Sequence, residues 1–405
     1  MERMKRVCTV VQSYYLRDPR VRREAEALAD KGYEVDVICL RDKGEPSRET
    51  VKGVNIYRVP LARRRATPAR YIFEYACFFC ATALVLLGRL FTRRYDLIHV
   101  NNMPDLLVFA TLLPRLFGSR VILDVHDPMP ELFMSKYGIG SDSRFIRLLA
   151  WQERISLRYC HRVLTVSEVM KDRLERIKGC PPVTSLLNVP DEKLLQRPEK
   201  WNRDVNAFVL LYTGTISARY GLGIAIEACA KLREKIRGLR LRLVGDGDDL
   251  PALRKAADRL GVSDIVEFHQ PVPLGKIPEI ISTCDVGISP HVDDVFTKLD
   301  FSTKVAEFVY MGLPTIVSRT QTIERYFDED TVLYCEPGSV DSFAEAVLKL
   351  YEQPDLREKL AARCAEFSSR FTWGSEKQVY LDFVAGLIGS PRPSAVNTQL
   401  GGGRG

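Results

Sequence analysis

Short runs rich in valine, isoleucine and leucine alternate with helical stretches along the chain. This alternation is typical of βαβ units, in which a crossover helix joins two parallel strands. The expected strands fall into two series, separated by a polar, proline-bearing stretch at residues 188–206. They are Arg6–Val11, Glu34–Leu40, Asn55–Val59, Asp96–Asn101, Arg120–His126 and Arg162–Ser167, followed by Phe208–Gly214, Leu239–Gly247, Ile265–Gln270, Asp285–Pro290, Pro314–Ser318 and Thr331–Glu336. The pattern predicts an α/β fold with two doubly wound domains.

The chain is too long for one ordinary hydrophobic core, because its 405 residues suit two domains. We expect the first domain at residues 1–190, a linker at 191–206 and the second domain at 207–371. Residues 390–405 have low complexity and are expected to be disordered. Several strands end in polar or glycine residues, and ligands of open α/β sheets bind beyond the carboxyl ends of the strands. One potential site per domain, facing a shared cleft, follows from this pattern.

Positive charge is concentrated in the first quarter of the chain. The net charge is +7, and residues 1–100 carry 20 basic minus 12 acidic residues, or +8. This asymmetry suggests an anionic partner for the N-terminal half, which could be a membrane surface, a phosphorylated substrate or nucleic acid. A solvated basic face without a partner is the alternative.

The cysteine usage is typical of a reduced, cytosolic protein. The ten cysteines are scattered, and most lie in apolar segments. Cys77 and Cys80 form a lone CxxC, for which helix packing is a better explanation than metal binding. The charged N-terminus runs directly into a strand-like segment, so we expect no signal peptide.

Residues 75–88 form an uncharged, apolar segment that is too short to span a bilayer as a helix. Basic residues flank it on both sides, namely Arg63, Arg64, Arg65, Arg70, Arg89, Arg93 and Arg94. A buried crossover helix and a helix docked on a bilayer remain alternatives, since an apolar face with basic flanks suits a membrane surface.

A second apolar helix, expected at residues 302–311, contains Lys304 and Glu307, which are three residues apart. An i,i+3 ion pair is the simplest explanation. Because desolvating both charges is costly, an interior pair would need further polar partners, and a bound ligand could supply them.

The order and spacing of several motifs resemble the retaining, nucleotide-sugar-dependent glycosyltransferases of family 4, which have the GT-B fold of two Rossmann-like domains facing a cleft. The motifs are NNMPDLLVFA, LDVHDPMPELF, LYTGTISARYGL, RLVGDGDDLPALRK, VEFHQPV and FSTKVAEFVYMGLPTIVS. The resemblance covers nearly the whole chain. It implies that the first domain binds the acceptor and the second the nucleotide sugar, and that residues 372–389 form a helix crossing back to the first domain.

The resemblance assigns roles to the 302–311 helix. Glu307 matches the glutamate that hydrogen-bonds the ribose, whereas the family's other glutamate is replaced by Leu299, with Asp300 beside it. Lys304 resembles a lysine of a subset of the family. With Ser302 and Thr303 it would hold the diphosphate at the helix N-terminus, a chemically suitable anion site.

Further donor contacts are implied by the loops after the strands. Many family members carry two basic residues in the loop that follows Gly214, where this chain has Thr215 and Tyr220. Arg219 is the remaining cation there, so we predict that it shares the pyrophosphate with Lys304. Donor contacts are also predicted for Gly214, Thr215, Tyr220, Gly245, Asp246, Gly247 and, near the base, Val272. Small residues such as glycine let a backbone approach a ligand closely, although a tight turn explains them equally well.

In the first domain, His126 resembles the family histidine that contacts the donor sugar, and Asp127 could orient it or touch the acceptor. Asn102 ends the preceding strand and is a candidate acceptor contact. Asp18 is an expected helix N-cap, followed by Pro19. The arginines after it, Arg20 among them, oppose the helix dipole, and an anionic acceptor would relieve that conflict.

We therefore expect a retaining glycosyltransferase of hexosyltransferase type, with His126, Arg219, Lys304 and Glu307 as catalytic residues. It would move a sugar from a nucleoside diphosphate, UDP being favoured over GDP, to a lipid-linked or saccharide hydroxyl acceptor in cell-surface polysaccharide synthesis. Neither metal nor cofactor nor nucleic acid is expected, and the location would be the cytoplasmic face of the membrane. A nucleotide-sugar epimerase and a non-catalytic binding module are the alternatives. A dehydrogenase is disfavoured, since no GxGxxG with a downstream acid follows either first strand.

Overall fold

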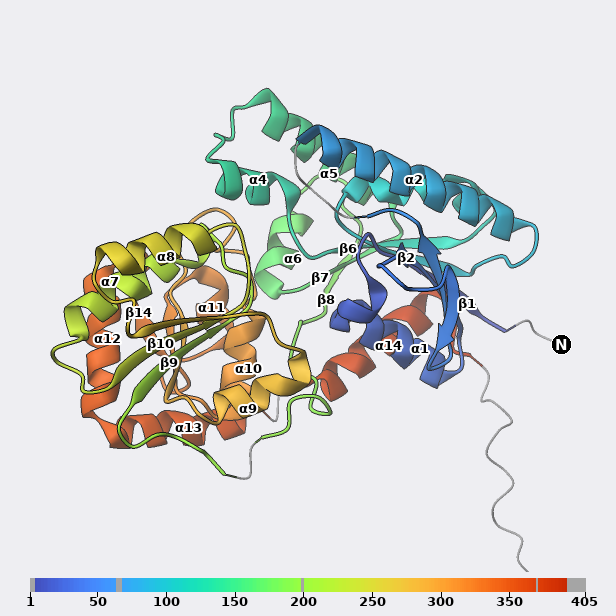
Figure 1. Ribbon diagram of the computed structural model, residues 1–405. Helices are drawn as coiled ribbons and strands as arrows, with labels where there is room; N and C mark the ends of the chain where they lie inside the picture. The colour runs from blue at the N-terminus through green and yellow to red at the C-terminus, as the bar shows by residue number, and fades with distance from the viewer. Residues whose placement is uncertain (1–3, 63–67, 198–199, 369–370, 392–405) are drawn as a thin grey trace, which may run out of the picture. The chain divides into compact units, whose positions relative to one another are not determined.

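The computed structural model describes residues 4–62, 68–197, 200–368 and 371–391. The chain divides into two compact units (Figure 1). Unit 1 comprises residues 1–130, 140–186 and 377–405, and unit 2 comprises residues 131–139 and 187–376. The division between the units falls after Leu186, where we expected the first domain to end at residue 190.

Unit 1 is built on an eight-stranded sheet with the order β3-β4-β2-β1-β5-β6-β7-β8. The paired strands run parallel except for β3, which is antiparallel to β4. The strands are β1 (Arg6–Val10), β2 (Glu34–Leu40), β3 (Arg48–Val51), β4 (Val54–Val59), β5 (Leu97–Asn101), β6 (Arg120–Val125), β7 (Arg162–Thr165) and β8 (Val183–Ser185). Nearly every residue of β2, β5 and β6 is buried, as expected for strands covered on both faces.

The helices of this half of the chain are η1 (Tyr15–Arg17), α1 (Pro19–Lys31), α2 (Pro68–Leu90), η2 (Asp105–Thr111), α3 (Leu112–Leu116), α4 (Met129–Tyr137), α5 (Arg144–Tyr159) and α6 (Glu168–Glu175). Most of α4 belongs to unit 2. The predicted N-cap of α1 is confirmed, because the Asp18 carboxylate accepts a hydrogen bond from the Val21 N–H and Pro19 occupies the first turn. The helix ends at Gly32, which has a positive φ of 99°.

Unit 2 is built on a six-stranded parallel sheet with the order β11-β10-β9-β12-β13-β14. Its strands are β9 (Phe208–Thr213), β10 (Leu239–Val244), β11 (Val266–His269), β12 (Val286–Ser289), β13 (Thr315–Ser318) and β14 (Leu333–Cys335). Its helices are η3 (Ala218–Tyr220), α7 (Leu222–Leu232), α8 (Leu250–Arg259), η4 (Leu274–Lys276), α9 (Ile277–Ile281), α10 (Thr303–Met311), α11 (Gln321–Tyr326), α12 (Val340–Glu352) and α13 (Pro354–Ser368). Helices α7, α8 and α12 pack against this sheet to form its largest apolar cluster.

The predicted α/β class and the two parallel sheets are confirmed, and each expected strand is present. Two strands were missed. β3 alternates exposed and half-buried residues at the edge of its sheet, and β8 is three residues long. Neither carries the continuous apolar run that marks a buried parallel strand.

The last helix, α14 (Trp373–Ile388), begins in unit 2, and its residues from Lys377 onward belong to unit 1. There Tyr380, Leu381 and Val384 are buried in the cluster that surrounds β1 and β2. The tail that we expected to be disordered lies, from residue 392 onward, outside the described residues.

Helix α2 has one packed face and one exposed face. Glu74, Phe78, Thr82 and Leu86 recur every four residues and are buried. The exposed apolar side chains are Ile72, Phe73, Leu84 and Leu87, with Phe91 just beyond the helix end. By length and composition alone, the helix over residues 70–90 could cross a membrane. In its most apolar stretch of 18 residues, 22% is buried. Core helices of soluble proteins also meet these criteria of length and composition. Of the flanking arginines, Arg63, Arg64 and Arg65 lie outside the described residues.

Candidate active site

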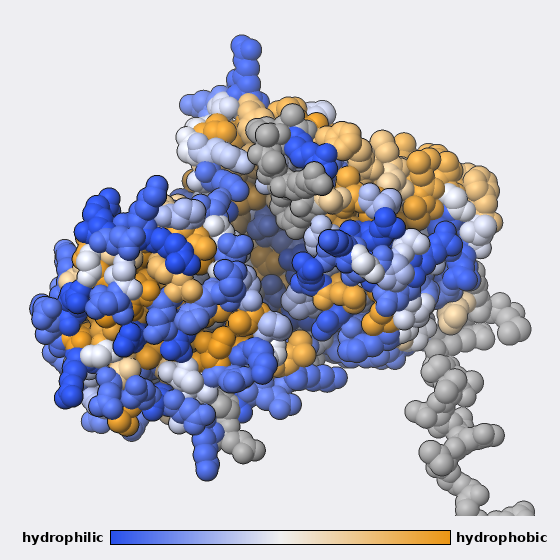
Figure 2. All heavy atoms as spheres, viewed as in Figure 1, coloured by the Kyte–Doolittle hydropathy of each residue, from blue (hydrophilic) through white to orange (hydrophobic). Residues whose placement is uncertain are grey.

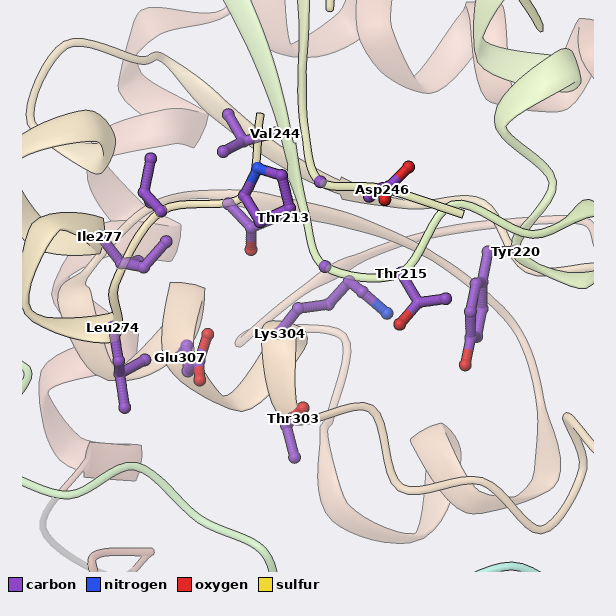
Figure 3. Close-up of a pocket in the computed structure, with 14 residues that line it drawn as sticks. Thr213, Thr215, Tyr220, Val244, Asp246, Leu274, Ile277, Thr303, Lys304 and Glu307 are labelled. Atoms are coloured by element: carbon purple, nitrogen blue, oxygen red, sulfur yellow. The ribbon is translucent and has the colours of Figure 1, made fainter. Parts of the chain in front are cut away.

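Unit 2 contains a cavity of about 450 Å³ beyond the carboxyl ends of β9 and β10, beside the N-terminus of α10 (Figure 3). Its position follows the rule for ligand sites in open α/β sheets. The lining consists of Thr213, Gly214, Thr215, Tyr220, Val244, Gly245, Asp246, Pro271, Val272, Leu274, Ile277, Thr303, Lys304 and Glu307. Nine of the residues predicted for the donor are therefore brought together here by five separate segments of the chain.

Lys304 lies in the first turn of α10 and extends toward Thr215 and Tyr220 (Figure 3). The residue is 9% exposed, and its Nζ lies 4.4 Å from the Tyr220 ring centroid and 5.0 Å from that of Tyr212. Burial lowers the pKa of Lys304, while the charges of Asp300 and Glu307 oppose that shift. A cation that is buried against aromatic rings at a helix N-terminus is well suited to an anionic ligand.

Glu307 lies one turn further along α10, half-buried on the cavity wall (Figure 3). Lys304 and Glu307 thus present opposite charges to the same cavity from one helix, as their spacing predicted. The rest of α10 is apolar and buried, including Val305, Phe308 and Val309. The apolar composition of this helix is therefore explained by the core of unit 2, and its two charges are explained by the cavity.

Gly245 and Gly247 are required by the packing of the protein chain itself. A Cβ atom on Gly245 would lie 1.8 Å from the Gly214 carbonyl oxygen, and one on Gly247 would lie 1.8 Å from that of Ile216. The loops after β9 and β10 remain paired, because the Ile216 N–H donates to the Asp246 carbonyl at 2.9 Å. The two glycines are thus required by the close approach of the neighbouring loop, a reason that neither explanation from the sequence named, and the approach to a ligand stays a prediction.

The sequence reasoning missed part of the lining, namely Thr213, Val244, Leu274 and Ile277. Thr213 and Val244 are the last residues of β9 and β10, so the strand-end rule could have found them. Leu274 and Ile277 come from η4 and α9 and carry no local signal. They form an apolar wall beside Glu307, on the side away from Lys304 (Figure 3).

Three predicted donor residues lie outside the cavity lining: Arg219, Gly247 and Ser302. Ser302 is buried at the N-cap position of α10, where its side chain makes no capping hydrogen bond. The Arg219 guanidinium lies 5.0 Å from the Phe296 ring centroid and 5.6 Å from that of Tyr220. Its Nε and Nη1 atoms are buried without a hydrogen-bond partner among the described residues. Arg219 is therefore next to a lining residue and keeps donor capacity for a ligand.

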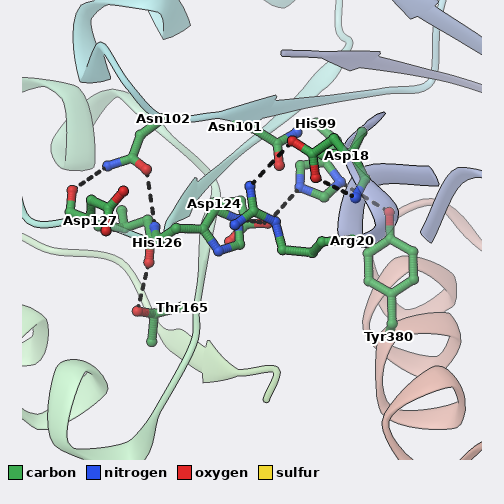
Figure 4. Close-up of polar contacts among 12 residues, drawn as sticks. Asp18, Arg20, His99, Asn101, Asn102, Asp124, His126, Asp127, Thr165 and Tyr380 are labelled. Atoms are coloured by element: carbon green, nitrogen blue, oxygen red, sulfur yellow. Dashed lines mark hydrogen bonds and ion pairs between the residues drawn. The ribbon is translucent and has the colours of Figure 1, made fainter. Parts of the chain in front are cut away.

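In unit 1, Asn102 holds the loop that carries His126 and Asp127. Its Oδ1 accepts the His126 N–H at 3.0 Å, and its Nδ2 donates to the Asp127 carbonyl at 2.7 Å and to Asp105 at 3.1 Å (Figure 4). The Asn102 side chain is used within the protein in this way, which argues for a positioning role beside its predicted contact with the acceptor.

The arginines on either side of Asp18 have acidic partners. Arg17 pairs with Asp42, and Arg22 pairs with Glu26 at 3.4 Å. Arg20 approaches Asp18 at 4.0 Å, and its Nε is buried without a partner among the described residues. Arg17 and Arg22 are thus paired within the protein, whereas Arg20 keeps open hydrogen-bonding capacity, and its contact with an anionic acceptor stays a prediction.

Two family models match this chain. One, described as a glycosyl transferase 4-like domain, matches residues 18–187, and the other, glycosyl transferases group 1, matches residues 196–367. Together they cover most of both units. The chain is a family 4-like GT-B glycosyltransferase.

Known proteins resemble this glycosyltransferase over most of its length. It is 28% identical over 402 residues to a D-inositol 3-phosphate glycosyltransferase of Stackebrandtia nassauensis, with 93% of this chain and 88% of the relative covered. The structure of a sucrose-phosphate synthase from Thermosynechococcus elongatus superimposes with a TM-score of 0.79 at 18% identity, covering 94% of this chain and all of that one. Anabaena HepE in complex with UDP-glucose gives a TM-score of 0.69 at 16% identity, covering 94% and 99%.

Among the described residues of the glycosyltransferase, one group of side chains has the donor atoms for a metal ion. Glu24, His99 and Asp124 bring one such atom each within 4.8 Å of one another. Both nitrogens of His99 are already engaged, Nδ1 with the Tyr380 hydroxyl at 2.9 Å and Nε2 with Asp124 at 3.2 Å. An ion would have to break these contacts, so the group is better described as a buried hydrogen-bonded network.

Proposed function

We propose that this glycosyltransferase is a retaining enzyme that uses a nucleoside diphosphate sugar, with UDP favoured over GDP, and transfers the sugar to a hydroxyl acceptor. The observation that carries the proposal is the pairing of Lys304 and Glu307 on α10 at a single cavity. Lys304 suits a diphosphate and Glu307 suits a ribose diol, because a carboxylate accepts two hydroxyl hydrogen bonds. The apolar wall of Val272, Leu274 and Ile277 suits the flat face of a base.

The same cavity suggests how the leaving group is stabilised. Negative charge develops on the diphosphate as the bond to the sugar breaks, and donors fixed in a partly buried site stabilise it more strongly than water does. We assign this role to Lys304, to Thr303 with the α10 N-terminus, and to Arg219. No step requires a metal in this scheme, and an assay with and without EDTA checks that expectation.

Retention is proposed to proceed by attack on the face that the diphosphate leaves, with the leaving phosphate helping to take the acceptor proton. Two carboxylates line the cavity, and both have other roles. Asp246 accepts the Gly247 N–H at 2.8 Å, and Glu307 is assigned to the ribose. A covalent glycosyl–carboxylate intermediate is therefore not part of the proposal. The anomeric configuration of the product, measured by proton NMR, decides between retention and inversion.

The UDP preference rests on the fold neighbour HepE, whose structure holds UDP-glucose. The direct test is mass spectrometry of products after incubation with a panel of UDP- and GDP-sugars and membrane lipid extract. Transfer from a UDP-sugar supports the proposal, and transfer from GDP-sugars alone contradicts the assignment of UDP as the donor nucleotide. The epimerase alternative predicts a changed sugar on the same nucleotide, and the binding-module alternative predicts no turnover of any donor.

For the acceptor, we propose a lipid-linked or saccharide hydroxyl compound that carries an anionic group. A relative bears the name D-inositol 3-phosphate glycosyltransferase, which denotes a phosphorylated acceptor for that protein. In unit 1 of this chain, the buried Nε of Arg20 has no hydrogen-bond partner among the described residues and can donate to an anionic group. Competition by inorganic phosphate, lost in Arg20→Gln, would support an anionic acceptor.

We also propose that unit 1 docks reversibly on the cytoplasmic face of a membrane through α2. Apolar side chains gather along this helix on the molecular surface (Figure 2). Leu84 is 68% exposed and Phe91 is 82% exposed, and Leu116 at the end of the packed neighbour α3 and Phe117 just beyond it are also exposed. Exposed apolar patches rimmed by basic residues mark membrane contacts. Co-sedimentation with anionic liposomes, weakened by salt, tests the proposal.

A further inference from the structure

A buried chain of polar side chains in unit 1 ends at His126 (Figure 4). The Tyr380 hydroxyl lies 2.9 Å from Nδ1 of His99, and Nε2 of His99 lies 3.2 Å from Oδ2 of Asp124. The same carboxylate oxygen lies 2.7 Å from Nε2 of His126. Tyr380, His99 and Asp124 are buried almost completely. The chain thus connects the last helix, α14, with the strands β5 and β6 and with the loop that begins at His126.

The direction of each contact follows from the chemistry of the groups. Asp124 has a lowered pKa, because contacts with both histidines outweigh its burial, so it is an ionised acceptor. Nε2 of His126, at 2.7 Å, and Nε2 of His99, at 3.2 Å, are therefore assigned a proton each, since a nitrogen lone pair facing the carboxylate at these distances would be repelled. Burial raises the pKa of Tyr380, which remains a hydroxyl and donates to Nδ1 of His99.

One ring nitrogen of His126 therefore remains available to a ligand. Its Nε2 lies 2.7 Å from Oδ2 of Asp124, an ion-pair contact outside ordinary hydrogen-bond geometry, and its Nδ1, which is also buried, has neither an ion-pair nor a hydrogen-bond partner among the described residues. Burial and the nearby Arg20 lower the pKa of His126, so the ring is neutral near pH 7. A neutral imidazole with a proton on Nε2 offers a lone pair at Nδ1, and a buried lone pair is costly unless a ligand hydroxyl pairs with it.

We propose that Tyr380, His99 and Asp124 are positioning residues that hold His126 in its Nε2–H tautomer, so that Nδ1 accepts a hydrogen bond from a substrate hydroxyl. The inference deepens the proposed function, on which it rests for the identity of the substrate as a polyol. It adds three residues to the site, one of them on α14, far along the sequence from the strands that carry the others.

The charged groups around His126 have opposing effects on its pKa. Asp127 and Asp124 raise the pKa of the ring, while burial and Arg20 lower it, and the loop backbone is fixed by Asn102. Glu24 on α1 also faces the network, and burial together with the Asp124 charge raises its pKa to about 7. Glu24 can therefore stay protonated beside Asp124 and avoid a second negative charge.

The tautomer can be observed directly in the intact protein labelled with ¹⁵N at histidine, since the chain has five histidines. Long-range ¹H–¹⁵N spectra distinguish a protonated from an unprotonated ring nitrogen. We expect His126 to show a protonated Nε2 and an unprotonated Nδ1 at pH 7, and Asp124→Asn to remove this preference. His161, whose Nδ1 accepts the Val121 N–H at 3.0 Å, is an internal reference that should not change. A Nδ1–H tautomer for His126 in the unaltered protein would overturn the inference.

A kinetic comparison separates positioning from folding. Asp124→Asn and Tyr380→Phe preserve side-chain shape, and both variants are checked by thermal unfolding. With Asp124→Asn we expect kcat/KM to fall by about 100-fold or more, as when a histidine loses its orienting carboxylate. With Tyr380→Phe, which removes one hydrogen bond, we expect a two- to tenfold loss, about the fold-change of a single bond. The loss should appear in kcat, with the KM for the donor little changed. A folded Asp124→Asn protein with normal kcat would overturn the inference.

The spectroscopic and kinetic experiments together test the inference and the proposed function separately. The spectra need only the protein, so an unexpected tautomer refutes the positioning chain whatever the reaction is. The expected tautomer without transfer from any donor would instead refute the proposed function.

Discussion

Helices α10 and α2 look alike in sequence, since each is a long apolar run with few charges, but they are used in opposite ways. In α10 the apolar residues are buried in unit 2, and the charges Lys304 and Glu307 face a cavity. In α2 one charge, Glu74, is buried and paired with Arg70 at 2.8 Å, whereas apolar side chains such as Leu84 lie on the surface.

The difference shows which residues of an apolar helix carry information. In a buried helix an ionised side chain is costly, so its presence points to a partner or a ligand. In a half-exposed helix the informative residues are the large apolar ones in water, because a monomeric surface seldom gathers them. Four predictions test this contrast, in order of decreasing expected effect on turnover or binding.

The largest effect is expected from Lys304→Met, which keeps the volume of the side chain and removes its charge. If Lys304 meets the leaving diphosphate, kcat should fall by about two orders of magnitude or more. The control is Lys298→Met, because Lys298 is half-exposed and pairs with Asp293 at 3.3 Å. Equal activity of the two variants in a donor-turnover assay would show that the buried charge has a purely structural role.

Removing the Glu307 carboxylate should weaken nucleotide binding. Glu307→Ala is expected to cost about 1.5–3 kcal/mol, the range for hydrogen bonds to a charged group. Isothermal titration with UDP measures the change, and Glu279→Ala, on the exposed surface of α9, is the matched control. Unchanged affinity in a folded Glu307 variant would exclude the assigned ribose contact.

On α2, a substitution on the exposed face should weaken membrane binding, whereas one on the packed face should destabilise the fold. Leu84→Ser with Phe91→Ser should reduce liposome binding by roughly tenfold or more, since full burial of such a side chain contributes about 1.5–3 kcal/mol and an interfacial helix face leaves water only in part. Phe78 is fully buried, so Phe78→Ala should instead lower the free energy of unfolding by about 3–5 kcal/mol. If the protein ignores anionic liposomes at low salt, the exposed face has another use.

The smallest effect concerns the pH dependence of Lys304. The charge of Asp300 raises the pKa of Lys304 against the lowering by burial. Asp300→Asn should therefore lower this pKa further, so that Lys304 loses its proton at a lower pH. The alkaline limb of the kcat profile should move to lower pH, and a limb that stays in place would show that Lys304 does not set it.

Much of the lining of the cavity in unit 2 could be predicted from the sequence, because its residues follow strand ends or begin a helix. Gly214, Thr215, Asp246 and Lys304 all lie where a parallel sheet gathers its loops, and these were found. Leu274 and Ile277 were missed, since an apolar residue on a short helix looks the same in a core and in a cavity wall.

The alternation of apolar strands and helices determined the α/β class and the positions along the chain of every strand except β3 and β8, because that information is local. Tertiary structure alone decided that Gly245 is needed by a neighbouring loop, that α2 buries Phe78 and exposes Leu84, and that Tyr380 reaches His99. These facts depend on contacts between segments far apart in sequence. No periodicity or spacing specifies such contacts, since they exist only when the packed chain brings the segments together.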